Sequence, residues 1–231
     1  MSKTPQGGDT TVRGRREFLG QMAVGALAGA GALALTGLAA SGPEALHAAT
    51  LAEPSLNVEH WLDGLTAKHR QIVDAYLAND GFPLAFAHNF LATATPAGSA
   101  GAVVVLRHFA LPLALDHPVW ARYKIGESLN ITDPATGKAA VRNPFLKPPT
   151  GVLLADDMAV DRLLSRHVIL GACNVALTVL SGKLAGNAGV SASAARDEWL
   201  AAVIPGITIL PSGVWGINRA QEKGCTYCTG G

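Results

Sequence analysis

The sequence predicts an α/β domain built on a mostly parallel β-sheet. Two observations lead to this fold class: short apolar runs rich in β-branched residues, and segments of helical spacing that alternate with them along the chain. The composition, 49% hydrophobic and 15% charged, excludes a disordered chain, which needs few apolar residues and a high net charge.

The N-terminus carries a second kind of pattern. Arg15-Arg16, a spacer and Phe18-Leu19 precede a charge-free run, residues 22–40, and resemble a twin-arginine export signal. Leu46-His47-Ala48 followed by Ala49 fits a small-residue cleavage site. We therefore predict a signal peptide over residues 1–48, an exported or periplasmic domain over residues 49–231, and no membrane span after cleavage. A retained N-terminal anchor is the alternative.

The charge balance of the predicted domain is neutral. The first 48 residues hold four of the 18 Lys and Arg and three of the 17 Asp and Glu, so the remainder carries 14 of each. A domain with no net charge lacks the excess of basic residues that is typical of nucleic-acid binding. Dinucleotide, P-loop, nucleophile-elbow and zincin motifs are also missing from the sequence, so we predict no cofactor and no metal site.

The first half of the domain holds the clearest strand. Residues 49–65 are mixed in polarity and suit a tail or a helix laid on the body, and residues 68–77 suit a strand or a helical turn. Gly81-Phe82-Pro83 opens a segment with helical spacing. The run AVVVL over residues 102–106 is continuous and β-branched, which predicts a strand buried on both faces.

The second half continues the alternation. An aromatic stripe at His117, Trp120 and Tyr123 suits a packed helix, and Asn143-Pro144-Phe145 is expected to anchor a polar insertion. The predicted elements are a helix over 113–123, the insertion over 126–150, a helix over 155–165, a strand over 167–172, helices over 174–182 and 193–203, a strand over 207–210, a helix capped by Ser212 and running to Glu222, and an edge strand over 225–228.

KHRQ (68–71), ALDHPVWARYKIGE (114–127) and RNPF (142–145) resemble the exported, twin-arginine-signal subgroup of the DsrE-like sulfur-relay family. Three further segments resemble the family as a whole. They are VVVLRHFALPLAL (103–115), HVILGACNVAL (167–177) and ILPSGVWGINRAQEKGCTY (209–227). The first is a strand ending in His, the second delivers a Cys-Asn motif, and the third closes on Gln-x-x-Gly-x-x-Tyr. The resemblance implies a Rossmann-like sheet with helices on both faces, a homo-oligomer, and handling of sulfur.

Cys173 is the first candidate for chemistry. It follows a predicted parallel strand and precedes a helix, the place where α/β sheets bind ligands and where the helix dipole favours a thiolate. The resemblance puts Cys173 in the position of the family's persulfide-carrying cysteine and Asn174 beside it as a substrate-binding residue. The alternative is a buried cysteine that acts as a small apolar side chain.

Arg107 and His108 follow the strand at 102–106 and are expected at the same edge of the sheet as Cys173. His108 is a candidate catalytic partner that activates the thiol, and Arg107 is a candidate binder of an anionic sulfur compound. Strand alternation predicts that one of the two side chains points into the site and the other away. The alternative is a loop-capping His108 and a solvated Arg107.

Cys225 and Cys228 form a Cys-x-x-Cys pair, which is a redox motif in an oxidising compartment. Thr229, not His, follows the second cysteine, so covalent haem is excluded. A terminal disulfide or two free thiols is the alternative to a pair that resolves a persulfide on Cys173.

Two functions of different classes remain open from the sequence. The first is an exported protein that handles sulfur or thiols, with Cys173 as the carrier and a small sulfur compound or a thiol protein as the partner. The second is a non-catalytic periplasmic binding or assembly module with the same fold.

Overall fold

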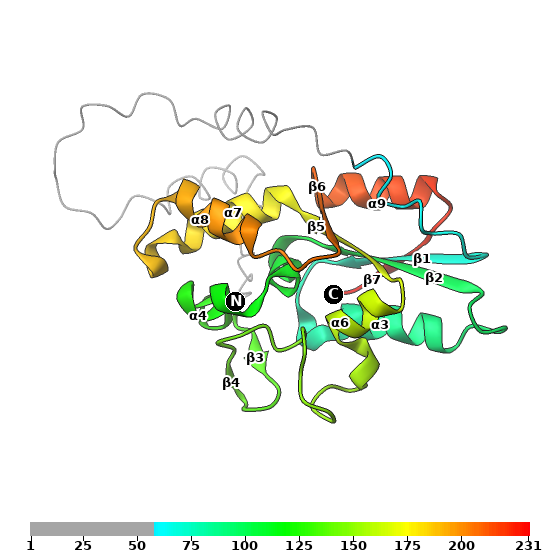
Figure 1. Cartoon of the computed structure of the whole chain (residues 1–231), viewed down its shortest axis with the longest axis horizontal. Coiled ribbons are helices and arrows are strands. Elements are labelled where there is room, and N and C mark those ends of the chain that lie inside the picture. The colour runs from blue at the N-terminus through cyan, green and yellow to red at the C-terminus, as the bar shows by residue number, and fades with distance from the viewer. Residues whose placement is uncertain (1–57) are drawn as a thin grey trace, which may run out of the picture. The chain divides into compact units, whose positions relative to one another are not determined.

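The computed structural model describes residues 58–231, which form an α/β unit around a parallel sheet of five strands (Figure 1). The strand order is β6-β5-β2-β1-β7, with helices on both faces, consistent with a Rossmann-like fold. The predicted fold class is therefore confirmed at this level. The strands are β1 (His69–Ala75), β2 (Ala100–Leu106), β5 (Ile169–Cys173), β6 (Ile207–Leu210) and β7 (Thr226–Thr229).

The β-branched run found in the sequence is the central strand β2. Its residues alternate between two separate apolar layers: Val103 and Val105 pack in one, Val104 and Leu106 in the other. All four side chains are fully buried because helices cover both faces of the sheet. A strand covered on both sides needs apolar residues at every position, which is why the run is continuous.

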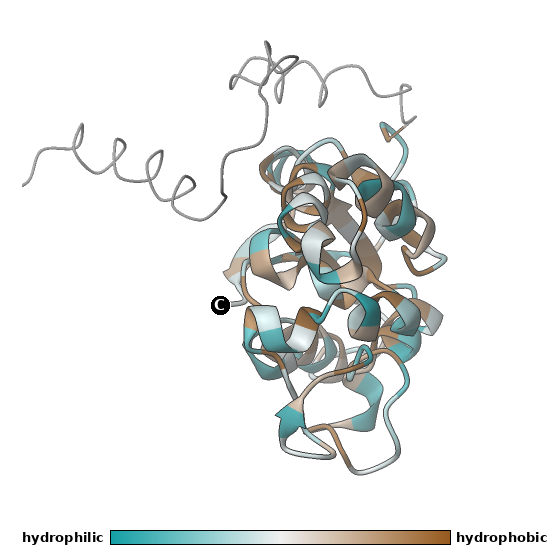
Figure 2. Cartoon of the chain, turned by 90° about the vertical axis from the view of Figure 1, so that its left-hand side faces the viewer, coloured by the Kyte–Doolittle hydropathy of each residue, from teal (hydrophilic) through white to brown (hydrophobic). Residues whose placement is uncertain are grey.

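The helices divide between the two faces. α3 (Phe82–Ala92) and α6 (Val160–Ser165) belong to the larger layer, and α9 (Gly213–Glu222) packs on the opposite face against β1, β2 and β5 (Figure 1). The helical ribbons change between apolar and polar residues along their length, as amphipathic covering helices do (Figure 2). The remaining α-helices are α4 (His117–Arg122), α5 (Ile125–Leu129), α7 (Asn174–Ala188) and α8 (Ala192–Ala201).

The chain changes direction across the sheet after β6. β1, β2, β5 and β6 are laid down one beside the next, and the chain then crosses by α9 to place β7 against β1 at the far edge. This crossing puts α9 on the opposite face from α3. The carboxyl ends of all five strands lie at one edge, because every pairing in the sheet is parallel.

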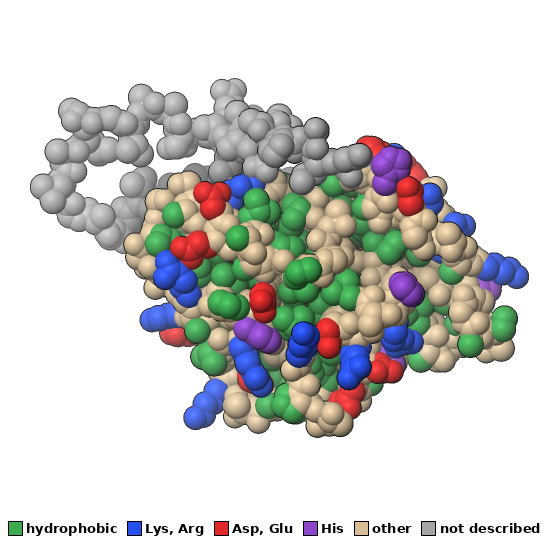
Figure 3. Space-filling model, in the orientation of Figure 1, with side chains coloured by type: hydrophobic (Ala, Val, Ile, Leu, Met, Phe, Trp, Pro, Cys, Tyr) green, Lys and Arg blue, Asp and Glu red, His purple; other side chains and the backbone are tan. Residues whose placement is uncertain are grey.

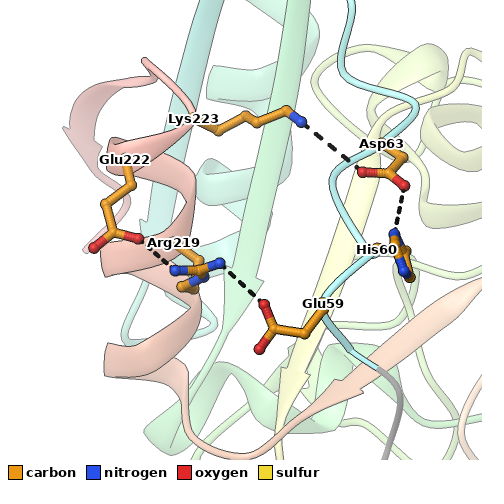
Figure 4. A network of polar contacts seen from close by, with 6 residues as sticks. All are labelled: Glu59, His60, Asp63, Arg219, Glu222 and Lys223. Atoms are coloured by element: carbon orange, nitrogen blue, oxygen red, sulfur yellow. Dashed lines mark hydrogen bonds and ion pairs between the residues drawn. The ribbon is translucent and has the colours of Figure 1, made fainter.

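The first described segment, residues 58–65, packs beside α9 instead of forming a free tail. Leu62 and Leu65 are buried in the smaller apolar layer. Polar contacts join this segment to the end of α9: Arg219 bonds Glu59 at 3.0 Å, and Lys223 lies 3.9 Å from Asp63 (Figure 4). These ion pairs are exposed, so burial of the leucines holds the segment in place.

The polar insertion is ordered, as the sequence predicts, and Asn143 anchors it. This side chain is 1% exposed, donates to the carbonyls of Leu113 and Leu115 at 3.0 and 2.8 Å, and accepts from the amide of Phe145 at 3.0 Å. Phe145 is buried in the larger layer. The insertion also contains α5 and a small hairpin, β3 (Thr132–Asp133) and β4 (Lys138–Ala139).

Two predicted helices are broken in the structure. The helix expected over 113–123 is a 3₁₀ segment, His108–Ala114, followed by α4. The two are separate because the backbone is extended at Leu115 and Asp116, where Asp116 caps α4 and Pro118 stands in its first turn. The helix expected over 155–165 is a 3₁₀ turn, Asp156–Met158, followed by α6, and Ala159 between them is extended at ψ 146°. Trp120 and Tyr123 are fully buried, which confirms the packing role of the aromatic stripe.

The predicted signal, residues 1–48, lies outside the described residues. Within residues 58–231 no helix is both long and apolar enough to cross a bilayer. The face in Figure 3 carries charges of both signs with hydrophobic side chains between them, in keeping with the balanced composition.

Candidate functional site

A cavity of about 350 Å³ opens where the parallel strands end. Its walls come from the residues after β2, from the first turns of α7 and from the start of α9. The lining side chains that carry chemistry are Arg107, His108, Cys173, Lys183 and Ser212. The structure thus brings together three of the residues selected from the sequence, because parallel strands share one carboxyl edge.

Cys173 is the last residue of β5 and the N-cap of α7. Its Sγ accepts a hydrogen bond from the amide of Ala176 at 3.3 Å, and the residue is 6% exposed. It is one of three free cysteines within residues 58–231. A sulfur that takes the capping position of a fifteen-residue helix lies at the positive end of the helix dipole, which favours negative charge there.

Arg107 is held by a fixed carboxylate. Its Nε and Nη2 donate to the two oxygens of Asp74 at 2.6 and 2.9 Å, and the hydroxyl of Tyr227 donates to the same carboxylate at 2.9 Å. The hydrogen bond to Asp74 is the largest influence that raises the pKa of Arg107, with smaller contributions from the Tyr227 and Cys173 groups. The bond to Asp74 likewise raises the pKa of Tyr227, so the phenol keeps its proton.

His108 has an unusual backbone. Its φ of 50° lies in the left-handed region, which side chains with a Cβ rarely adopt and which clusters at functional sites. The ring stacks on Tyr76 with centroids 4.5 Å apart and 6° between the planes. Partial burial, followed by the charges of Arg107 and Lys183, lowers the pKa of His108, so the imidazole is neutral at neutral pH and can accept a proton.

The expectation that Arg107 and His108 point to opposite sides is wrong. Both residues line the cavity. Alternation does not apply because β2 ends at Leu106 and the left-handed backbone at His108 turns the chain. The guanidinium of Arg107 also lies over the Tyr76 ring, 5.0 Å from its centroid, so one aromatic ring supports both side chains.

Asn174 lies outside the cavity and is not placed for the substrate-binding role predicted for it. The residue is 2% exposed and does not line the cavity, and its Oδ1 accepts from Nη2 of Arg196 on α8 at 3.2 Å. Its visible contact is therefore one that ties α7 to α8.

Cys225 and Cys228 pack in the two apolar layers on opposite faces of the sheet. Cys225 belongs to the smaller apolar layer beside α9, whereas Cys228 packs against the larger one. Burial raises the pKa of the Cys225 thiol. β7 is separated from β5 by two strands, so three spacings place it about 14 Å from the strand of Cys173. Neither thiol lines the cavity.

Three further residues shape the site and were not selected from the sequence. Asp74 holds Arg107, Tyr76 stacks on His108, and Lys183 adds a second cationic group to the cavity wall beside Arg107. The one sequence signal for Asp74 is a carboxylate near the end of a strand, and it was not used. Lys183 lies ten residues beyond Cys173 on one helix, a spacing that carries meaning only once the helix is known to extend that far.

No family model matches the chain, and no curated protein matches it. Among residues 58–231 no three His, Cys, Asp or Glu side chains are grouped in a way that would hold a metal ion.

Proposed function

We propose that this chain is an exported protein that handles sulfur or thiols, with Cys173 as the carrier of a persulfide. The observation that carries the proposal is the position of the Cys173 sulfur: it caps α7 at the wall of a cavity that Arg107, His108 and Lys183 also line. A thiolate, and the persulfide anion formed from it, are both stabilised by a helix N-terminus and nearby cations.

His108 is proposed as the group that accepts the thiol proton. A neutral imidazole is required for this step, and the lowered pKa of His108 supplies one at neutral pH. Arg107, fixed by Asp74, is proposed as the binder of an anionic sulfur compound. The resemblance to DsrE-like sulfur-relay proteins in the segments around Arg107, Cys173 and Tyr227 supports the same assignment.

A second function rests on the walls of the cavity. Six of its lining residues are apolar, and two of these, Val175 and Val214, are exposed. Such a surface also suits a binding or assembly module that performs no chemistry, with a second copy of the chain as one partner. In that case replacement of the thiol leaves function unchanged.

The test is the intact mass of the full chain after incubation with inorganic polysulfide. We expect a gain of one sulfur atom that reductant removes and that Cys173→Ser abolishes. The matched control, Cys228→Ser, keeps the gain because Cys228 lies outside the cavity. A protein that gains no sulfur, or that gains it equally after Cys173→Ser, overturns the proposal.

A further inference from the structure

The cavity combines positive charge with apolar walls. Arg107 and Lys183 are its cationic lining residues, His108 adds a neutral imidazole, and no carboxylate of the described residues lines it. Its apolar lining residues are Phe109, Val175, Ala176, Val179, Leu180 and Val214. A volume of about 350 Å³ lies near the lower end of ligand cavities, which span about 300–1,000 Å³, so the occupant is a small molecule.

Lys183 supplies charge that nothing in the described chain neutralises. Arg107 shares its charge with Asp74 through two hydrogen bonds, but the ion pairs found within residues 58–231 include none made by Lys183. The charges of Lys183 and Arg107 both reach His108, because each lowers the pKa of its imidazole. Arg107 and Lys183 therefore place two cationic groups on the wall of the cavity that Cys173 also lines.

The apolar walls distinguish between inorganic and organic anions. Thiosulfate and sulfate are hydrated on every side, and an apolar wall offers them no hydrogen bond to replace that water. A hydrocarbon group gains free energy when it covers Val175, Val179 and Val214, two of which are exposed in this structure. A ligand with an acidic group and an apolar body satisfies both halves of the lining.

We infer that the cavity selects small organic sulfur anions, an apolar body bearing a thiosulfonate or similar acidic sulfur group, over inorganic ones. The inference rests on the proposed function of Cys173. With a thiosulfonate, R–SO₂–S⁻, the Cys173 thiolate attacks the outer sulfur and forms a new S–S bond. The S–S bond of the donor breaks, and the sulfinate R–SO₂⁻ leaves with its electron pair. The thiol proton goes to His108, and no external oxidant or reductant is needed.

Binding is measured without the reaction, by calorimetry on the full chain carrying Cys173→Ser. We expect benzenesulfonate to bind at least about tenfold more tightly than sulfate, because only the former covers the apolar walls. Adding Lys183→Met is expected to lower the affinity for benzenesulfonate about threefold, because it removes a positive charge that solvent partly screens. Lys138→Met, on the exposed β4, leaves the affinity unchanged. Sulfate that binds as tightly as benzenesulfonate overturns the inference.

A second variant tests the apolar wall directly. Val179→Asp places a carboxylate in the cavity. It is expected to lower the affinity for benzenesulfonate more than tenfold, because an apolar contact is lost and the carboxylate repels the sulfonate. Val141→Asp, at a residue 66% exposed outside the cavity, is the matched control. If both variants bind benzenesulfonate equally and unfold at the same urea concentration as the protein without them, the inference is also overturned.

Loading of Cys173 then separates this inference from the proposed function. Benzenethiosulfonate is expected to load the wild-type thiol faster than thiosulfate at equal concentration. Loading by polysulfide without selective binding of benzenesulfonate leaves the proposed function standing and overturns the ligand class. Selective binding without loading of Cys173 from any donor upholds the ligand class and overturns the proposed function.

Discussion

Asp74 organises the site at the scale of single residues. Its carboxylate is 4% exposed and receives hydrogen bonds from both Arg107 and Tyr227, so it fixes the guanidinium at the cavity wall. A buried carboxylate of this kind is stable only with its partners, because an uncompensated charge there is costly. Arg107 is thereby restricted to one position and needs no rearrangement to meet an anion.

Asp74→Asn is expected to destabilise the fold by about 2 kcal/mol, because it leaves Arg107 without its charged partner. Tyr227→Phe removes one hydrogen bond and should cost about 1 kcal/mol. Urea unfolding measures both. Asp63→Asn, at an exposed carboxylate, is the control and should change stability by less than about 0.5 kcal/mol. An Asp74→Asn protein as stable as this control would show that the pair contributes nothing.

His108 makes the molecule sensitive to pH. Partial burial and the charges of Arg107 and Lys183 lower its pKa in the folded chain. The unfolded chain therefore binds this proton first, and stability is lost as pH falls through the ordinary imidazole range toward the lowered value. Above that range His108 adds no pH dependence.

Lys183→Met should raise the pKa of His108, because it removes one of the charges that lower it. An NMR titration of the ring protons measures the change, with Lys138→Met as the control. His108→Gln should also flatten the fall in stability at mildly acidic pH. A His108 pKa that does not move on Lys183→Met would place Lys183 too far away to act on the cavity.

At the scale of elements, the start of α9 touches Arg107 closely. A Cβ added at Gly213 would lie 2.6 Å from the Cβ and 2.8 Å from the Cδ of Arg107, closer than real side chains approach. Ser212 caps this helix by accepting from the amide of Trp215 at 3.2 Å, so the turn cannot retreat without losing its cap. Glycine at 213 is required for the helix and the arginine to pack together.

Gly213→Ala is expected to cost about 1–3 kcal/mol through overpacking and to weaken anion binding by displacing Arg107. Gly186→Ala is a matched control within α7, since its added Cβ meets nothing within 4 Å, and it should be neutral or slightly stabilising. Urea unfolding and benzenesulfonate calorimetry measure the two effects. Unchanged anion binding in Gly213→Ala would show that Arg107 takes no part in it.

The elements predicted best from the sequence are those whose formation depends on one strong local signal. The β-branched run at 102–106 needs burial on both faces, and Ser212 is a strong cap, so β2 and α9 were predicted within two residues. The helix expected over 113–123 begins only at His117, because the backbone is extended at Leu115 and Asp116 and Pro118 stands in the first turn of α4. Local spacing describes one face of a helix, but it does not decide whether the backbone continues through a proline.

At the scale of the whole molecule, the parallel sheet explains which site residues the sequence could predict. Arg107, His108 and Cys173 each follow an apolar strand, and parallel strands end at one edge, so their meeting at one cavity follows from topology. The order of the strands in the sheet could not be predicted from the sequence pattern. It places β7 beside β1, which brings Tyr227 to Asp74 and keeps Cys228 away from Cys173.

Peptide mapping after loading tests whether Cys173 carries sulfur inside the cavity. The full chain is treated with benzenethiosulfonate, its thiols and persulfides are alkylated, and the mass of each cysteine peptide is measured. We expect one extra sulfur on the Cys173 peptide and none on the peptide that holds Cys225 and Cys228. Extra sulfur on that second peptide, with an unmodified Cys173, would contradict this expectation.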